Sequence, residues 1–372
     1  GMIPETDILP ADQVEDWQDI TASTPVADKD LISRCVCIKL NGGLGTSMGL
    51  QKAKSLLKVK GEDTFLDLIV RQVKHLRSIS GTPVRLLLMN SFSTSADTLA
   101  YLEKYAADGF ADRAEVELLQ NRVPKILADS LSPASCPEQP ELEWCPPGHG
   151  DLYPALLGSG WLDRLLEDGV KYAFVSNSDN LGAQLDMNFL RWFAENGAPF
   201  VMEVTRRTEA DRKGGHLAVR KSDGQLILRE VAQCPDEDIP EFQNISRHRY
   251  FNTNTLWIRL DALKEILDAN GGVLPLPMIR NKKTLNPRDP ESAPVYQLET
   301  AMGAGIECFP GARAVNVPRS RFFPVKTTSD LFLLRSDAIA VDEHGNVALA
   351  PERQGNTPVV DLDSKLYKLV DS

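Results

Sequence analysis

Residues 38–49 read IKLNGGLGTSMG, with glycines at positions 42, 43, 45 and 49 directly after an apolar run. Inside regular structure each glycine costs about 0.5–1 kcal/mol relative to alanine, so such a cluster needs a reason. The run that precedes it has the length and continuity of a buried parallel strand. A strand that ends in a glycine loop can bring several N–H groups against a phosphate. The alternative interpretation is a plain flexible turn.

Strand and helix patterns alternate through the first half of the chain. Apolar runs predict strands at 33–40, 83–90, 116–120 and 171–179, and helical periodicity predicts helices at 64–79, 95–106 and 151–167. Thr64 is a suitable N-cap for the first of these helices. Alternation at this spacing predicts an α/β fold with a mixed, mostly parallel central sheet and crossover helices.

Three later segments have a different character. Prolines through 121–150 forbid a long helix there and predict an extended loop that covers a site. From residue 198 the runs alternate apolar and polar residues, which predicts a strand-rich, antiparallel insertion before a helix at 261–270. We therefore expect one large domain over residues 1–335 and a small C-terminal region over 336–372.

Composition excludes several classes of protein. The chain has 372 residues, is 42% hydrophobic and carries a formal charge of −11, without a run of Lys or Arg, which argues against a nucleic-acid partner. No stretch approaches the roughly 18 apolar residues of a membrane span. The six cysteines form no CxxC pair, so we expect reduced thiols in a cytoplasmic protein.

The glycine loop matches neither common phosphate-binding fingerprint. No register supplies GxxxxGK[ST], and GxGxxG fails because Met48 stands where the last glycine should be. Lys52, Lys54 and Lys58 follow the loop and could add positive charge to a polyphosphate cradle.

Ordered motifs along the chain carry a resemblance to a known family. They are LNGGLGTSMG with Lys54, TFLDL (64–68), LMNSF (88–92), PPGHGD (146–151), VSNSDNLGA (175–183), EVT (203–205), KGG (213–215), FNTNTLW (251–257), QLETAMGA (297–304) and NVPRSRFFPVKTTSDL (316–331). In this order they resemble the eukaryote-like UTP–glucose-1-phosphate uridylyltransferase (UDP-glucose pyrophosphorylase) family over residues 33–335.

The resemblance implies a nucleotidyltransferase with a Rossmann-like, glycosyltransferase-A-like domain and a strand-rich sugar-binding insertion. Its substrates would be UTP and glucose 1-phosphate, and its products UDP-glucose and pyrophosphate, with Mg²⁺ as cofactor. Longer family members carry a C-terminal β-helix that contributes to assembly, and this chain stops about where it would begin. We therefore expect a monomer or a weak dimer.

The resemblance also assigns residues to the nucleotide. Lys54 would meet phosphate oxygens, and Gln120 would hydrogen-bond uracil, although by itself it reads as an exposed loop glutamine. The remaining nucleotide-binding positions would be Leu40, Gly42, Gly43, Gly45, Thr46, Met89 and Gly148.

The same resemblance assigns sugar-binding positions, namely His149, Asn177, Glu203, Gly215 and Asn254. Judged as bare residues, Glu203 and Asn254 would be solvent-facing strand residues, and Asn252 competes for the role of Asn254. A lone His149 between glycines is more often structural than a general base or metal ligand.

Charged residues complete the expected site. Asp179 stands at a strand's carboxyl end, where an aspartate can hold Mg²⁺ on phosphates, or it could cap the following segment. By the resemblance it is the Mg²⁺ ligand. Lys326 would bind the reacting phosphates, although alone it reads as a surface lysine. Arg319 and Arg321 could reach phosphate, but bracing of the loop by acidic partners is the favoured interpretation.

Two rival functions stay open from the sequence. The first is an enzyme of the same superfamily that uses another sugar 1-phosphate, such as N-acetylhexosamine 1-phosphate. The second is a non-catalytic UDP-sugar-binding protein, which retention of Lys54, Asp179 and Lys326 together argues against.

Overall fold

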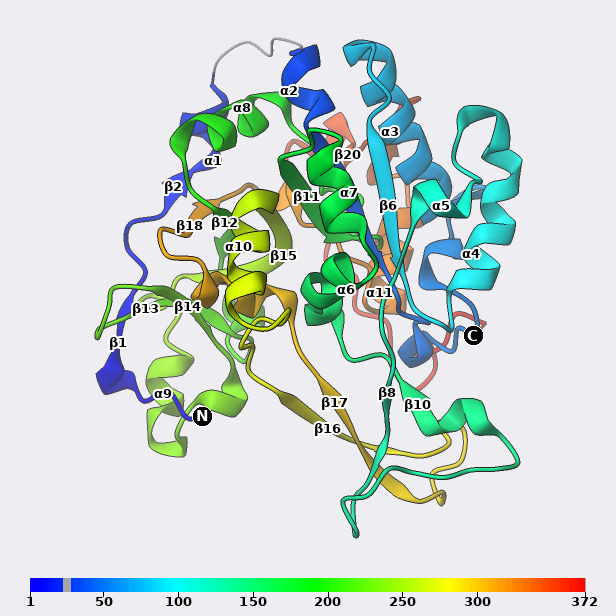
Figure 1. Cartoon of the computed structure of the whole chain (residues 1–372), viewed down its shortest axis with the longest axis vertical. Helices are drawn as coiled ribbons and strands as arrows, with labels where there is room; N and C mark the ends of the chain where they lie inside the picture. Colours follow the sequence, from blue (N-terminus) through cyan, green and yellow to red (C-terminus); the bar gives the residue numbers. More distant parts are fainter. Residues whose placement is uncertain (23–27, 372) are drawn as a thin grey trace.

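The structure, a computed structural model, describes residues 1–22 and 28–371, and within them the main element is an eight-stranded sheet (Figure 1). Its order is β2 (Glu15–Asp16), β18 (Arg313–Asn316), β12 (Phe200–Arg206), β15 (Tyr250–Arg259), β11 (Tyr172–Asn177), β3 (Cys35–Asn41), β6 (Arg85–Asn90) and β7 (Glu117–Leu119). All neighbours in this described sheet pair in parallel except those of β15. The predicted mixed, mostly parallel sheet is confirmed.

Helices pack on both faces of this sheet, which explains why β3 reads as a continuous apolar run. Cys35 and Cys37 point to one core and Val36 and Ile38 to the other, as the strand period of two requires. The first core receives side chains from α1 (Trp17–Thr21), α2 (Lys29–Ser33), α3 (Phe65–Ser80), α4 (Ser95–Leu102), α5 (Arg113–Val116), α8 (Met187–Asn196) and α11 (Thr328–Arg335). The second receives them from α6 (Leu152–Gly158), α7 (Trp161–Glu167) and α10 (Leu260–Ala269).

Local signals set several of these helices. The hydroxyl of Thr64 accepts a hydrogen bond from the Asp67 N–H at 3.2 Å, and the Asp67 carboxylate accepts one from the Thr64 N–H at 2.8 Å. This capping box confirms the predicted start of α3. The single helix expected at 151–167 is two short helices, because Gly160 with φ of 81° interrupts it between α6 and α7.

The strand-rich segment after residue 198 divides between two sheets. Strands β12 and β15 pair antiparallel within the central sheet, as predicted for this segment, and β12 also pairs in parallel with β18. The other antiparallel part is a smaller sheet of β1 (Ile8–Pro10), β13 (His216–Arg220) and β14 (Leu226–Arg229). The apolar alternation is present in both places and cannot by itself tell them apart.

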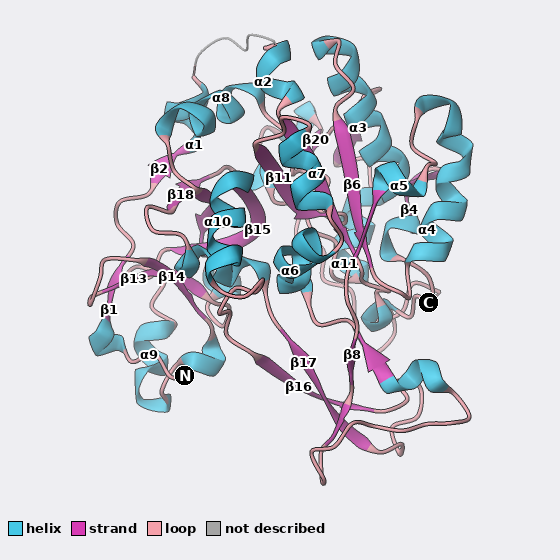
Figure 2. Cartoon of the chain, viewed as in Figure 1, coloured by secondary structure: helices cyan, strands magenta, loops and turns pink. Residues whose placement is uncertain are grey.

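The segment 121–150 leaves the body of the molecule and forms an arm with residues 279–299 (Figure 2). Its strands are β8 (Val123–Pro124), β9 (Ile126–Leu127), β10 (Trp144–Cys145), β16 (Ile279–Thr284) and β17 (Pro294–Glu299). Strand β17 joins β9 to β16, while β8 pairs with β10. Both ends of the arm return to the sheet edge where the glycine loop lies.

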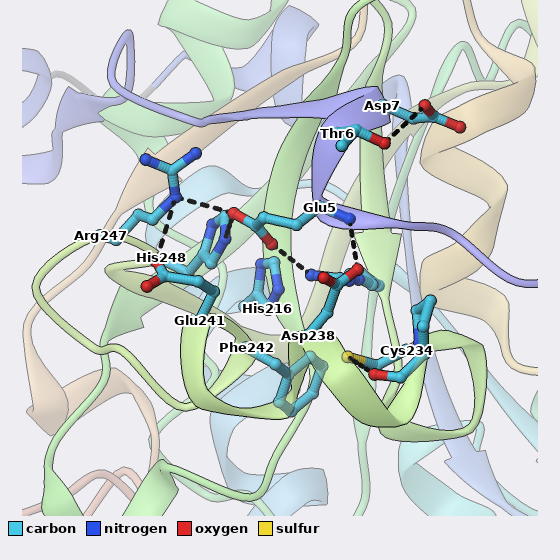
Figure 3. Close-up of polar contacts among 12 residues, drawn as sticks. Glu5, Thr6, Asp7, His216, Cys234, Asp238, Glu241, Phe242, Arg247 and His248 are labelled. Carbon is cyan, nitrogen blue, oxygen red and sulfur yellow. Dashed lines mark hydrogen bonds and ion pairs between the residues drawn. The ribbon is translucent and has the colours of Figure 1, made fainter.

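The start of the chain is held by one carboxylate (Figure 3). Glu5 accepts hydrogen bonds from Arg229 at 2.6 Å, Arg247 at 2.7 Å and His248 at 2.8 Å. Burial alone would raise the pKa of Glu5, but these three donors lower it to about 2 and keep the carboxylate charged. This cluster fastens β1 to the smaller sheet and to α9 (Ile239–Phe242).

Residues 336–371 return to the main body. The hairpin of β19 (Ile339–Val341) and β20 (Val347–Leu349) contributes Ile339 and Val347 to the first core, and Lys60 donates to the Ile339 carbonyl at 2.6 Å. The division of the chain into a domain over 1–335 and a small C-terminal region over 336–372 stays a prediction. The last short hairpin is β4 (Lys58–Lys60) with β5 (Asp63–Thr64).

Two further findings concern the described residues as a whole. None of their helices combines the length and the apolar character that a bilayer crossing requires. All six cysteines are free thiols, four of them buried, as the reduced state predicted for them requires.

Candidate active site

A cavity of about 360 Å³ opens at the carboxyl ends of β3, β6 and β11. Parallel strands present their carboxyl ends at one sheet edge, where loops can surround a ligand. Its lining consists of Leu40, Gly42, Gly43, Gly45, Lys54, Met89, Gln120, Pro146, Gly148, His149, Asn177, Ser178, Asp179 and Glu299. The glycine loop, the base of the arm and the end of β11 therefore meet around one space.

The glycines of the loop allow a left-handed backbone at two positions and a close approach of a side chain at a third. Gly45 and Gly49 have φ of 65° and 81°, in the left-handed region that side chains disfavour. The loop closes when the Lys54 N–H donates to the Gly43 carbonyl at 3.1 Å. A Cβ at Gly42 would lie 2.2 Å from Gln120 Oε1, so the bare backbone there lets the glutamine side chain lie against the loop.

Lys54 and Asp179 form an ion pair inside the cavity. The distance from Lys54 Nζ to Asp179 Oδ2 is 2.6 Å, and both side chains are mostly buried. The other oxygen of the carboxylate, Oδ1, is buried and has no hydrogen-bond partner. A buried carboxylate oxygen without a donor is unfavourable, so this atom is available to a cation or to a donor on a ligand.

The donor chemistry at this point suits Mg²⁺ bound together with phosphates. Mg²⁺ prefers hard oxygen ligands and is usually held by one or two carboxylates, water and substrate phosphates. Within the part of the chain that the structure describes, no three acidic, His or Cys side chains gather around a common point. A cation on Asp179 would therefore take its other ligands from a bound phosphate and from water.

His149 is neutral and has a defined tautomer. Burial lowers the pKa of His149 to about 4. Its Nδ1 accepts the backbone N–H of Met302 at 2.9 Å, so a neutral ring must carry its proton on Nε2. His149 can thus donate a hydrogen bond into the cavity, but it is not a base near neutral pH.

The loop around His149 packs tightly against residues 299–302. A Cβ at Gly148 would lie 2.4 Å from the Thr300 carbonyl oxygen, and one at Gly150 would lie 2.3 Å from the Thr300 hydroxyl. The Gly150 N–H donates to that same carbonyl at 2.9 Å. This contact brings Glu299, at the end of β17, to the cavity wall.

Asn177 and Asn254 lie side by side next to this cavity. Pairing between β12 and β15 shifts register at Glu203/Val204, and Asn254, opposite the shift, has φ of 63°. A β-bulge with left-handed backbone re-aims a side chain, and such strain often accompanies functional sites. The Asn254 amide donates to Asn177 Oδ1 at 3.0 Å, so Asn254 reaches the cavity through Asn177 and does not line it.

Glu203 has a structural position. Its side chain is 1% exposed, and its carboxylate accepts from Arg321 at 2.6 and 2.9 Å and from Trp257 at 2.9 Å. The interpretation of Glu203 as a solvent-facing strand residue is wrong. Its assignment to the sugar stays a prediction, and in this conformation Glu203 is not part of the cavity wall.

Both arginines of the 316–331 motif brace acidic groups. Arg321 forms the buried pair with Glu203, and Arg319 donates to Asp211 at 2.8 Å on the exposed surface. Their partners are thus carboxylates, which agrees with the bracing interpretation. The Asn180 amide also bonds the Arg321 carbonyl at 3.1 Å, which ties this motif to the end of β11.

Lys326 lies beside the cavity without entering it. The N–H of the preceding Val325 donates to the Asp179 carbonyl at 3.3 Å, so the main chains are adjacent. The Lys326 side chain is exposed and lines a neighbouring hollow with Ser47 and Met48. The side chains of Lys54 and Asp179 thus meet in the cavity, whereas only the backbone next to Lys326 reaches Asp179.

Thr46 and Gly215 also lie outside the cavity wall. Thr46 is exposed at the start of the short turn that continues the glycine loop. Gly215 packs against Glu230, whose carboxylate would lie 2.5 Å from an added Cβ. Their ligand-binding roles stay predictions.

Three cavity residues were not singled out from the sequence, namely Pro146, Ser178 and Glu299. Each lies inside a motif that was recognised, PPGHGD, VSNSDN or QLETAMGA. The resemblance assigns roles to Asn177 and Asp179 but none to Ser178, which lies between them. For Glu299 the signal was the acidic residue in QLETAMGA itself.

The family model described as UTP–glucose-1-phosphate uridylyltransferase matches residues 3–372. The UTP–glucose-1-phosphate uridylyltransferase of Saccharomyces cerevisiae is 47% identical over 91% of this chain and 66% of its own length. That of Solanum tuberosum is 42% identical over 93% of this chain and 71% of its own. The chain thus spans about two thirds of the length of these relatives.

Solved structures match with the same fold. A UDP-glucose phosphorylase from Trypanosoma brucei has a TM-score of 0.90 and 50% identity, and covers all of this chain and 79% of its own. A mutant UDP-glucose pyrophosphorylase from Leishmania major, in complex with UDP-glucose, has a TM-score of 0.89 and 49% identity with the same coverage.

Proposed function

Because the chain belongs to the UTP–glucose-1-phosphate uridylyltransferase family, we propose that it converts UTP and glucose 1-phosphate to UDP-glucose and pyrophosphate. The observation that carries the proposal is the cavity in which the glycine loop faces the Lys54–Asp179 pair. A loop of exposed N–H groups with a cation and a carboxylate beside it suits a nucleoside triphosphate and its metal.

The chemistry requires no general base. A phosphate oxygen of glucose 1-phosphate attacks the α-phosphorus of UTP, and a new oxygen–phosphorus bond forms. The bond from the α-phosphorus to the bridging oxygen breaks, and pyrophosphate leaves with the electron pair. The attacking oxygen is already an anion, so the reaction depends on alignment and on neutralisation of charge. The lowered pKa of His149 agrees with this, since its neutral ring serves as a donor.

The charged residues have separate roles in this scheme. Lys54, whose amine lies 2.6 Å from Asp179, is placed to exchange that partner for phosphate oxygens of the triphosphate. Asp179 Oδ1 would hold Mg²⁺, which supplies Lewis-acid neutralisation of phosphate charge when bound. Lys326 is proposed to reach the phosphates only after its side chain turns from the neighbouring hollow toward Asp179.

The polar side chains account for recognition of base and sugar. Gln120 is 6% exposed and lies against Gly42, so its amide can present both a donor and an acceptor to uracil in a fixed orientation. We assign the hexose to the side of Asn177 and His149, which carry donors into the cavity. Asn254 then acts as a positioning residue for Asn177.

We further infer a Rossmann-like, glycosyltransferase-A-like arrangement, supported by nucleotide-site residues at the carboxyl ends of β3, β6 and β11. A cytoplasmic location is proposed on the six free thiols, which an oxidising compartment would tend to pair.

Pyrophosphate release from UTP and a panel of sugar 1-phosphates, with Mg²⁺, tests the function. We expect glucose 1-phosphate to give the highest kcat/KM, and Lys54→Met to lower turnover by about 10²–10³-fold. Lys52→Met is the matched control, because Lys52 is exposed on the same loop and does not line the cavity. Absence of pyrophosphate with every sugar, or normal turnover of Lys54→Met, would refute the proposal.

A further inference from the structure

A second cavity, of about 240 Å³, lies on the opposite side of β3 from the first. Its walls come from β3, β11, α3 and the segment that leads into α8. Most of the lining is apolar, contributed by Cys37, Val73, Leu76, Ile79, Phe174, Ala183, Leu185 and Met187. The remaining lining is Lys39, Gln72, His75, Gln184, Asp186 and Asn346. None of these residues has a role in the proposed transfer reaction.

Lys39 gives this cavity its chemical character. The residue is 4% exposed, and its amine donates to the Ser176 hydroxyl at 2.7 Å and to the Ala183 carbonyl at 2.9 Å. Both acceptors are neutral. Among the residues that the structure describes, no carboxylate lies within 4.0 Å of the amine. Two of its three N–H donors make these hydrogen bonds, and the amine also lies 5.3 Å from the centre of the Phe174 ring.

A buried cation without an ion-pair partner is costly, and the carboxylate of Glu203 favours the charge of Lys39 only from beyond ion-pair distance. Burial lowers the pKa of Lys39 to about 8, so at pH 7 most of the amine is still protonated. A ligand that brings a negative charge into the cavity would remove this cost.

We propose that this cavity binds a small monocarboxylate, whose anionic head pairs with Lys39 and whose apolar body lies among the aliphatic and aromatic walls. The cavity of about 240 Å³ has room for a short aliphatic carboxylate. A single carboxylate suits one lysine, and the apolar lining disfavours a sugar or a nucleotide.

The cavity lining also contains one carboxylate, that of Asp186. Asp186 caps α8 by accepting the Phe189 N–H at 2.9 Å, which engages its charge at the helix N-terminus. His75 stacks on His344 with ring centroids 3.7 Å apart. Lys39 is the lysine of the lining.

The two cavities share two strands, so occupancy of one can affect the other. Side chains alternate along a strand, so Lys39 lines the second cavity and bonds Ser176 on the same side of the sheet, while Leu40 and Asn177 line the first cavity. A carboxylate that displaces the Lys39–Ser176 hydrogen bond would act on β11 one residue before Asn177. We infer that the ligand is an effector of UDP-sugar binding, and this coupling alone depends on the proposed function.

Isothermal titration of the full chain with hexanoate at pH 7 tests the site, with hexan-1-ol as the uncharged ligand of the same length. We expect one hexanoate per chain, bound about tenfold or more tightly than hexan-1-ol, because a charged hydrogen bond is worth that difference. Ile79 lines the cavity and is 45% exposed, so a Trp at this position should fill the cavity and abolish binding. Val231→Trp, at a 48% exposed residue outside the cavity, is the matched control and should bind normally.

Lys39→Met should bind hexanoate and hexan-1-ol equally, and Ile79→Trp carries the test if Lys39→Met fails to fold by circular dichroism. No hexanoate binding, equal binding of both ligands by the unmodified chain, or binding that survives Ile79→Trp would overturn the site. Saturating hexanoate should change the Kd of UDP-glucose by about fivefold or more. An unchanged Kd would overturn the coupling, whereas no UDP-glucose binding at all would count against the proposed function.

Discussion

Replacement of Arg321 by Met should destabilise the fold strongly, because it leaves Glu203 charged and buried. The two side chains are 9% and 1% exposed, and the guanidinium donates to both carboxylate oxygens at 2.6 and 2.9 Å. Removal of one partner from a buried pair costs about 3–5 kcal/mol, since the remaining charge has no counter-charge. The guanidinium also lies 4.0 Å from the centre of the Trp17 ring, so packing is lost as well.

Urea unfolding followed by tryptophan fluorescence at pH 7 measures this loss. Arg319→Met is the matched control, because Arg319 is two residues away and pairs with Asp211 at 2.8 Å with its side chain 46% exposed. Exposed pairs contribute only about 0–1 kcal/mol. In the double variant with Glu203→Gln, the buried charge is absent, so the double variant should be more stable than Arg321→Met alone.

The same variants separate a structural role of Glu203 from a sugar-binding role. If the carboxylate serves the core, Glu203→Gln should lower the free energy of unfolding and leave the KM for glucose 1-phosphate nearly unchanged. A loss below about 1 kcal/mol for Arg321→Met, or a loss equal to that of Arg319→Met, would refute the reasoning. If Glu203→Gln instead raises the KM for glucose 1-phosphate strongly and leaves the stability unchanged, Glu203 binds the sugar substrate.

Gly42→Ala should raise the KM for UTP by about 10²-fold in steady-state kinetics, because the new Cβ would lie 2.2 Å from Gln120 Oε1 and must displace it; an unchanged KM would contradict this. Between pH 6.5 and about 4 the unfolded chain binds a proton at His149 that the folded chain does not, so this residue makes the free energy of unfolding fall as the pH falls. His149→Gln should flatten that slope in urea titrations, and an unaltered slope would disprove the assignment. Asp179→Asn should remove the response of pyrophosphate release to added Mg²⁺ and leave Lys54 without its partner. If the release still depends on Mg²⁺ in this variant, Asp179 is not the Mg²⁺ ligand.

Local signals were sufficient for the part of the site that lies on β3 and β11. A buried strand must end in polar residues at the sheet edge, so the glycine loop and Asp179 could be placed together from the order of residues along the chain. Local signals left Lys52, Lys54 and Lys58 as alternatives, and only the family resemblance selected Lys54, whose N–H closes the loop on the Gly43 carbonyl in the structure.

Tertiary contacts decided the rest. The left-handed backbone of Asn254 arises from a register shift between two strands, which alternation of apolar and polar residues does not reveal. Burial of Glu203 depends on Arg321, 118 residues away. Strand β16 is largely exposed and carries Arg280, Lys282 and Lys283, so it lacks the apolar pattern by which strands are recognised.

A crystal structure of this chain with UDP-glucose and Mg²⁺ tests the central claim most directly. The account predicts uracil against Gln120, the diphosphate within hydrogen-bond distance of Lys54 Nζ, and the cation on Asp179 Oδ1. A nucleotide bound outside the glycine loop, or a cation without contact to Asp179, would contradict it.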